Sequence, residues 1–136
     1  MNALRISTRS LPIKSFTRGF HVNRPCFTGK TIEATSDNFK QLVNDADHPV
    51  IVDFYADWCG PCKMLTPLLT KFVEKNPAVT LVKINVDDHN DIAAKYKIAS
   101  LPTVIAFNKG EEVDKFIGLL SGPKVESFVQ AHAGRK

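Results

Sequence analysis

Two cysteines, Cys59 and Cys62, stand three residues apart where an apolar run gives way to an amphipathic one. Residues three apart in a helix have Cα atoms about 5 Å apart, within the roughly 4.4–6.8 Å that a disulfide spans. The two cysteines can therefore form and open a disulfide without a large backbone movement. The patterns on either side predict a strand that ends before Cys59 and a helix that begins there.

The apolar run before the cysteines, Val50–Tyr55, predicts a strand that is buried on both faces. Asp53 is the only acid within it. A carboxylate inside such a strand loses its hydration, which costs free energy and indicates a proton-handling role. The alternative is a polar group at a strand end, bonded by a turn.

A helix over Cys59–Lys75 is predicted by apolar residues that recur at i, i+3 and i+4, and Pro67 should kink it. Cys59 falls at the N-terminus of this helix, where unpaired N–H groups and the helix dipole favour a thiolate. Cys62 lies one turn further in and should be less exposed. One sulfur offered to solvent with a second behind it is what two-step thiol–disulfide exchange requires. The apolar residues in question are Leu65, Leu68, Leu69, Phe72 and Val73.

The rest of the chain alternates strand and helix patterns and predicts an α/β fold. This order implies a mixed central sheet of about five strands, flanked by about four helices on its two faces. The further strands are expected over Lys30–Ala34 (an edge strand), Val79–Val86, Thr103–Phe107 and Val113–Ile117. The further helices are expected after a cap at Thr35 or Ser36, over Asp91–Tyr96, and from Ser121 onward.

The net charge of +4 is distributed unevenly along the chain. Residues 1–32 carry six Lys and Arg and no acid, whereas residues 33–136 carry twelve Lys and Arg and fourteen acids. The part expected to fold is therefore not basic, which argues against a nucleic-acid partner. No run of 18 apolar residues occurs, so no membrane-spanning helix is expected.

Residues 1–26 combine Arg, Ser and Thr with scattered apolar residues and contain no acid, which is typical of a mitochondrial transit peptide. A secretory signal would need an unbroken apolar stretch of about 7–15 residues. Arg18-Gly19-Phe20 resembles the pattern that the matrix processing peptidase cuts, so we expect cleavage near Phe20, a single domain over 27–136 and a location in the mitochondrial matrix. A basic tail that stays attached is the alternative, and Cys26 has no assigned role.

A zinc site is the main alternative for the two cysteines. Zinc needs four ligands, usually with a second close pair of Cys or His. The other candidates are scattered singly along the chain, so we expect no metal and no other cofactor. A purely structural disulfide is also disfavoured, because a compartment that reduces thiols would not preserve it. The scattered residues are Cys26, His21, His48, His89 and His132.

The cysteine pair and several separate motifs resemble the thioredoxin family, and the resemblance covers roughly Lys30–Ala131. The resemblance implies a thioredoxin fold and a protein-disulfide reductase. In that reaction Cys59 is the attacking nucleophile, Cys62 the resolving thiol and Asp53 the buried acid that helps to deprotonate Cys62. The motifs are Val52–Lys63 (VDFYADWCGPCK), Leu101-Pro102-Thr103, Lys109-Gly110 and Ile117-Gly118.

The resemblance also implies a cis peptide bond before Pro102 and a lysine, Lys83, near the buried acid. The alternative for Lys83 is a solvated lysine on the strand face. The alternative for Trp58 is a residue buried in the core. Tyr55 and Asp57 depart from the usual family pattern, and we expect neither to touch the sulfur chemistry. The surface expected to contact clients comprises Trp58, Gly60, Pro61, Leu101 and Gly118.

Gly60-Pro61 resembles the reducing members of the family rather than the disulfide isomerases. The resemblance therefore implies re-reduction by an NADPH-dependent thioredoxin reductase and clients such as peroxiredoxins, and we expect a monomer. No G-x-G-x-x-G or P-loop is present, so NADPH would be used only by the reductase. Two other function classes stay open: a binding module whose redox chemistry is incidental, and a glutathione-linked oxidoreductase.

Overall fold

The computed structural model describes residues 28–134. The basic leader over 1–26, the expected cleavage near Phe20, and Cys26 all lie outside the described residues. Within the described part, five strands form one mixed sheet in the order β1-β3-β2-β4-β5. The first three of these are parallel, and β4 runs antiparallel to both β2 and β5. Their bounds are β1 Thr31–Glu33, β2 Val50–Tyr55, β3 Thr80–Asn85, β4 Thr103–Asn108 and β5 Glu111–Ile117.

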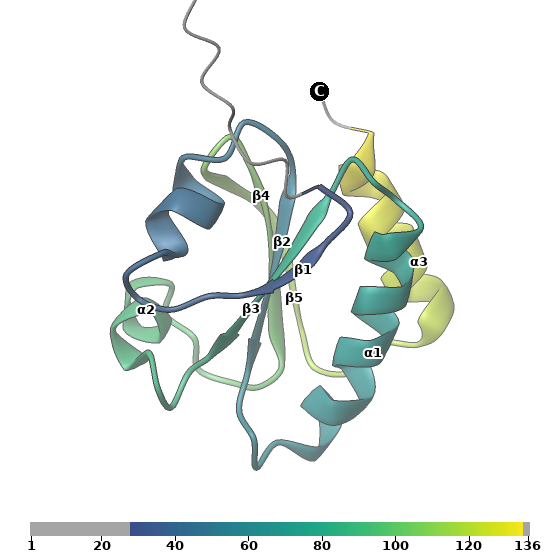
Figure 1. The fold of residues 1–136 in the computed structure, drawn as a ribbon. Coiled ribbons are helices and arrows are strands. Elements are labelled where there is room, and N and C mark those ends of the chain that lie inside the picture. Colours follow the sequence, from purple (N-terminus) through teal and green to yellow (C-terminus); the bar gives the residue numbers. More distant parts are fainter. Residues whose placement is uncertain (1–27, 135–136) are drawn as a thin grey trace, which may run out of the picture.

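Helices cover both faces of this sheet, as Figure 1 shows. The π-helical turn η1 (Lys40–Asn44) and the short α2 (Asn90–Lys95) lie on one face, and α1 (Gly60–Glu74) and α3 (Gly122–Ala133) lie on the other. The predicted fold class is confirmed, with five strands and four helices among residues 28–134. None of the helices in this part has the length and apolar character that a membrane span needs.

Strand β2 contributes to two separate hydrophobic cores because its side chains alternate between the faces. Val52 and Phe54 belong to the core beneath η1 and α2, while Ile51 belongs to the core beneath α1 and α3. Asp53 follows Ile51 on the α1–α3 face and is completely buried. The central strand thus carries its one acid into the side of the sheet that α1 covers.

The first helical segment differs from its prediction. A helix capped by Thr35 or Ser36 was expected, but no side chain caps the π-helical turn η1. The Ser36 hydroxyl instead donates to Asp91 at 2.6 Å. A contact across 55 residues therefore takes the group that a local cap would use, while the expected apolar side chains Phe39 and Val43 are still buried.

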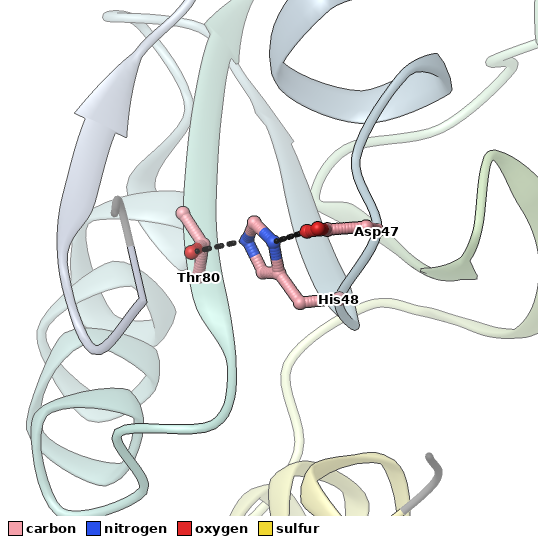
Figure 2. A network of polar contacts seen from close by, with 3 residues as sticks. All are labelled: Asp47, His48 and Thr80. Carbon is pink, nitrogen blue, oxygen red and sulfur yellow. Dashed lines mark hydrogen bonds and ion pairs between the residues drawn. The ribbon is translucent and has the colours of Figure 1, made fainter. Parts of the chain in front are cut away.

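His48 links the amino-terminal ends of β2 and β3. Its Nε2 lies 2.9 Å from the Thr80 hydroxyl and its Nδ1 lies 3.2 Å from an Asp47 carboxylate oxygen (Figure 2). Thr80 is only 1% exposed, which excludes its hydroxyl as a nucleophile for an outside substrate. The contacts stabilise the end of the sheet opposite to the cysteines, which follow the carboxyl end of β2.

Candidate active site

The two cysteines lie where β2 passes into α1, as predicted. Cys59 is the N-cap of α1, and its sulfur accepts the Cys62 N–H at 3.3 Å. The two are joined by a disulfide with their Cα atoms 5.3 Å apart, within the usual range for such a bond. The structure therefore describes the oxidised form, with the Cys59 sulfur at the positive end of a fifteen-residue helix.

Both cysteines are nearly enclosed in this form. Cys59 is 4% exposed and Cys62 is 2% exposed, so the expected difference between them has the predicted direction but is small. They form a small apolar cluster with Ala56, against which Leu101 and Tyr55 pack. A thiolate that attacks the Cys59 sulfur must therefore approach it closely.

Asp53 lies in the middle of β2 and not at a turn, so the strand-end interpretation is wrong. One carboxylate oxygen accepts the Thr66 hydroxyl at 2.7 Å, while the other has no hydrogen-bond partner. Burial raises the pKa of Asp53 from 3.8 to about 6, and the Thr66 bond and the Lys83 charge reduce the rise. An acid that titrates near neutrality can both accept and release a proton under physiological conditions.

Lys83 stands directly beside Asp53 in the register between β3 and β2. Its ammonium lies 4.9 Å from the centre of the Tyr55 ring, so it is half-buried rather than freely solvated. A pocket of about 270 Å³ is lined by Cys62 together with Lys83 and Thr66. Thr66 and Lys83 are the two groups that lower the pKa of Asp53, so this pocket connects the resolving cysteine with the surroundings of the buried acid.

Trp58 is 71% exposed, so the interpretation as a core residue is wrong. Its indole N–H donates to Asp87 at 2.8 Å, which fixes the ring beside the cysteines. A second hollow runs from Trp58 past Val86 to Leu101. An exposed aromatic ring held next to an apolar hollow can bind a segment of another protein.

The peptide bond between Leu101 and Pro102 is cis, as the resemblance implied. The Gly118 N–H donates to the Pro102 carbonyl at 2.8 Å, and Gly118 has a φ of +89° that side chains disfavour. Leu101 packs against the disulfide cluster, and the hydrogen bond joins Gly118 to the neighbouring Pro102. Gly60 and Pro61 form the exposed first turn of α1.

Sequence reasoning missed two residues of this site. Thr66 follows Cys62 by four positions on the same helix, so helical spacing could have placed it beside the resolving cysteine. Asp87 contacts Trp58 across 29 residues, and nothing in the sequence pattern signals that contact. Tyr55 and Asp57, expected to stay apart from the chemistry, both line the pocket beside Cys62.

A metal centre has no support in the described part of the chain. Among residues 28–134, no group of three or more His, Cys, Asp or Glu side chains could hold a metal ion. The dithiol itself is the redox-active group, which is the usual situation in proteins that exchange thiols and disulfides.

The fold and the cysteine pair together define a thiol–disulfide oxidoreductase, and comparison with known proteins identifies the group to which it belongs. The sequence pattern that defines the Thioredoxin family matches residues 30–131. This chain belongs to the thioredoxin family, and its function is that of a protein-disulfide reductase.

Individual relatives agree with this assignment. The chain is 41% identical over 118 residues to a thioredoxin of Rattus norvegicus named as mitochondrial, covering 86% of this chain and 70% of that protein. It is 45% identical over 101 residues to a thioredoxin of Porphyra purpurea, covering 74% and 94%. A mutant thioredoxin of Halobacterium salinarum has a similar structure, with a TM-score of 0.72, 28% identity, and coverage of 80% of this chain and 96% of that one.

Proposed function

We propose that this chain reduces disulfides of client proteins in the mitochondrial matrix, with Cys59 as the attacking group and Cys62 as the resolving group. The observation that carries this order is the position of the two sulfurs on α1. Cys59 caps the helix, whereas Cys62 lies inside the first turn and lines a pocket together with Thr66, which donates to Asp53.

In the first step the Cys59 thiolate attacks one sulfur of a client disulfide. The new bond joins Cys59 to that sulfur, the client S–S bond breaks, and the second client sulfur leaves with the electron pair as a thiolate. The Cys62 N–H points at the Cys59 sulfur, and the dipole of α1 adds to its effect. Both favour the thiolate that begins the reaction.

In the second step the Cys62 thiol gives its proton to the Asp53 carboxylate, directly or through one water. The resulting thiolate attacks the Cys59 sulfur, the bond between Cys59 and the client breaks, and the client leaves with that electron pair as a second thiolate. The client has then gained two electrons and the enzyme holds the Cys59–Cys62 disulfide seen in the structure. With a pKa near 6, Asp53 is mostly ionised at neutral pH and available as the acceptor.

The client would lie across the exposed residues around the disulfide. Trp58 offers an exposed ring, Gly60 and Pro61 form the exposed first turn, and Leu101 lies beside the sulfurs. An extended client segment would pair with the main chain of Leu101, next to Pro102 and Gly118. Peroxiredoxins are the class of client that we expect first.

The oxidised protein would be re-reduced by a thioredoxin reductase that uses NADPH. The location rests on the basic, acid-free residues 1–26 and on relatives of rat and mouse that are named as mitochondrial thioredoxins. The leader would be a transit peptide cleaved near Phe20, followed by a single domain over 27–136. Deletion of residues 1–20 should abolish import into mitochondria and leave the melting temperature and the activity unchanged.

The direct test is an insulin-reduction assay in which the rate is measured as consumption of NADPH. The full chain and the chain without residues 1–20 should both reduce insulin when NADPH and thioredoxin reductase are supplied. Glutathione with glutathione reductase should not replace that system. Recycling by glutathione alone would indicate a glutathione-linked oxidoreductase instead. A Cys59→Ser chain that still performed the cellular function would indicate a binding module.

A further inference from the structure

Three charged side chains form a row across three neighbouring strands. The register places Glu33 of β1 opposite Lys83 of β3, and Lys83 opposite Asp53 of β2. Residues opposite one another in a sheet project from the same face. Glu33 is exposed and Asp53 is fully buried, so the row leads from the edge strand to the buried acid.

Tyr55 contacts this row at two points. It stands two residues after Asp53 on β2 and therefore projects from the same face. Its hydroxyl donates to the Glu33 carboxylate, and its ring centre lies 4.9 Å from the Lys83 ammonium. Tyr55 and Lys83 also line the pocket beside Cys62. One side chain thus joins the edge strand to the lysine that influences Asp53.

We propose that Tyr55 and Glu33 are positioning residues, which hold the Lys83 ammonium beside Asp53 and so set the pH range over which Asp53 accepts the Cys62 proton. The hydrogen bond to Glu33 fixes the tyrosine ring, and the ring confines the lysine by a cation–π contact. This inference rests on the proposed role of Asp53. The reacting groups are unchanged, since the proton still passes from the Cys62 sulfur to a carboxylate oxygen of Asp53.

The charges around Asp53 influence its pKa. Burial raises its pKa, and the Lys83 charge lowers it, so a lysine that is less confined beside Asp53 allows the pKa to rise further. Opposite Asp53, strand β4 presents the apolar Val104 and no charge. Besides Lys83, the charged and polar groups that face this region from the packed elements are Glu33, Tyr55, Asp57, Lys63, Thr66 and Asn85, the last of which donates to Asp57.

Two substitutions separate the positioning effect from simple loss of charge. Tyr55→Phe keeps the ring and removes only the hydroxyl that bonds Glu33, so the ring and Lys83 lose their anchor and the pKa of Asp53 should rise. Glu33→Gln keeps an oxygen that can accept the tyrosine hydroxyl but removes a negative charge, so the pKa of Asp53 should stay the same or fall. If Tyr55 and Glu33 only supported the fold, both substitutions would shift the pKa of Asp53 in the same direction.

Tyr96 offers a matched control. It is the only other tyrosine of the chain, its hydroxyl accepts a hydrogen bond from Asn44, and Lys95 lies 5.5 Å from its ring centre. Tyr96 packs in the core on the opposite face of the sheet from Asp53. Tyr96→Phe therefore removes the same kind of group without touching the row of charges.

The experiment is a pH titration of the Asp53 carboxyl carbon by NMR in the oxidised full-length chain, in which no active-site thiol titrates. Tyr55→Phe should raise the titration midpoint by roughly half a pH unit, because the ring that confines Lys83 stays but loses the hydrogen bond that fixes it. Glu33→Gln and Tyr96→Phe should not raise it. The pH profile of insulin reduction should shift in parallel with that midpoint.

The possible outcomes separate this inference from the proposed function. An unchanged midpoint in Tyr55→Phe, or an equal rise in Glu33→Gln or Tyr96→Phe, would overturn the positioning role, whatever Asp53 does in catalysis. The pH profile of insulin reduction is also measured for Asp53→Asn. If Asp53→Asn kept the wild-type pH profile of turnover, Asp53 would not be the proton acceptor, and the positioning of Lys83 could not affect turnover through it.

Discussion

The two faces of the central sheet are built differently. Beneath η1 and α2 the core is apolar and aromatic, and Tyr96 packs against Phe39, Phe54 and Phe107 with ring centres 5.4 to 6.1 Å apart. Beneath α1 and α3, buried apolar residues surround ionisable ones. The two buried side-chain atoms without a hydrogen-bond partner in the described part, Asp53 Oδ1 and His132 Nδ1, belong to residues of this second face.

This difference separates stability from chemistry within one sheet. The alternation of side chains along β2 gives Phe54 to the aromatic core and Asp53 to the other face. A charged group without full hydrogen bonding costs stability, so it is retained where the reaction uses it. Substitutions of the fully buried aromatic residues on the first face should therefore change stability alone, and the Asp53 substitution should change stability and turnover in opposite directions.

The largest effect on stability is expected from Phe107→Ala on the aromatic face. Phe107 is 2% exposed and packs edge-on against Tyr96, so its removal leaves a cavity. We expect a loss of about 3–5 kcal/mol in the free energy of unfolding, measured by urea denaturation. Turnover at 25 °C and its pH profile should be unchanged in the folded protein. A shifted pH profile would show that the two faces are not independent.

A gain in stability is expected from Asp53→Asn. The pKa of Asp53 is raised by burial from 3.8 to about 6, so the folded state holds this proton more firmly than the unfolded state does. Stability is therefore fully present below the unfolded pKa, is lost as the pH rises toward the folded pKa, and stays lower above it. The loss corresponds to about 3 kcal/mol at neutral pH, so Asn should stabilise the fold by about 1–3 kcal/mol there.

The same Asp53→Asn protein should reduce insulin more slowly, because the acceptor for the Cys62 proton is missing. Urea denaturation at neutral and at acidic pH gives the stability half of the test, and the gain should shrink at acidic pH. A protein destabilised at neutral pH, or one with unchanged turnover, would mean that Asp53 is a structural group. Cys62 would then lose its proton by another route.

The smallest effect is expected from Asp114→Ala, which tests His132, the other residue in the described part with a buried side-chain atom that lacks a hydrogen-bond partner. His132 is 2% exposed, and its Nε2 lies 3.1 Å from an Asp114 carboxylate oxygen. Without that partner the imidazole stays buried with no bonded nitrogen, which should cost about 1–2 kcal/mol. Turnover should not change, because His132 lies on α3 and does not line the pocket beside Cys62. Slower turnover would extend the functional region to α3.

Local sequence patterns predicted the elements that hold the site. The apolar run Val50–Tyr55 is a strand with the bounds expected, and the helix expected over Cys59–Lys75 covers Gly60–Glu74 with Cys59 as its cap. Burial of Asp53 could also be predicted, since both of its neighbours in the strand are apolar. These features depend on residues close together in the chain, which a periodic pattern reports well.

The features that escaped prediction depend on contacts between distant segments. Ser36 bonds Asp91 rather than capping a helix, Trp58 bonds Asp87, and Tyr55 bonds Glu33 from the edge strand. The last contact depends on the order β1-β3-β2, because β3 separates the two partners and Lys83 lies between them. Strand order and register are set by the whole fold, so a local pattern carries no signal for such pairs.

The most direct test of the central claim compares two serine variants. Cys62→Ser keeps the attacking thiol and removes the resolving one, so client proteins should accumulate on Cys59 as mixed disulfides. Cys59→Ser removes the first attack and should trap none. The measurement is the amount of covalent complex recovered from a mitochondrial extract after thiols are blocked, with release by dithiothreitol as the control. Abundant complexes with Cys62→Ser and none with Cys59→Ser are predicted, whereas equal trapping by both variants would contradict the proposed order of attack.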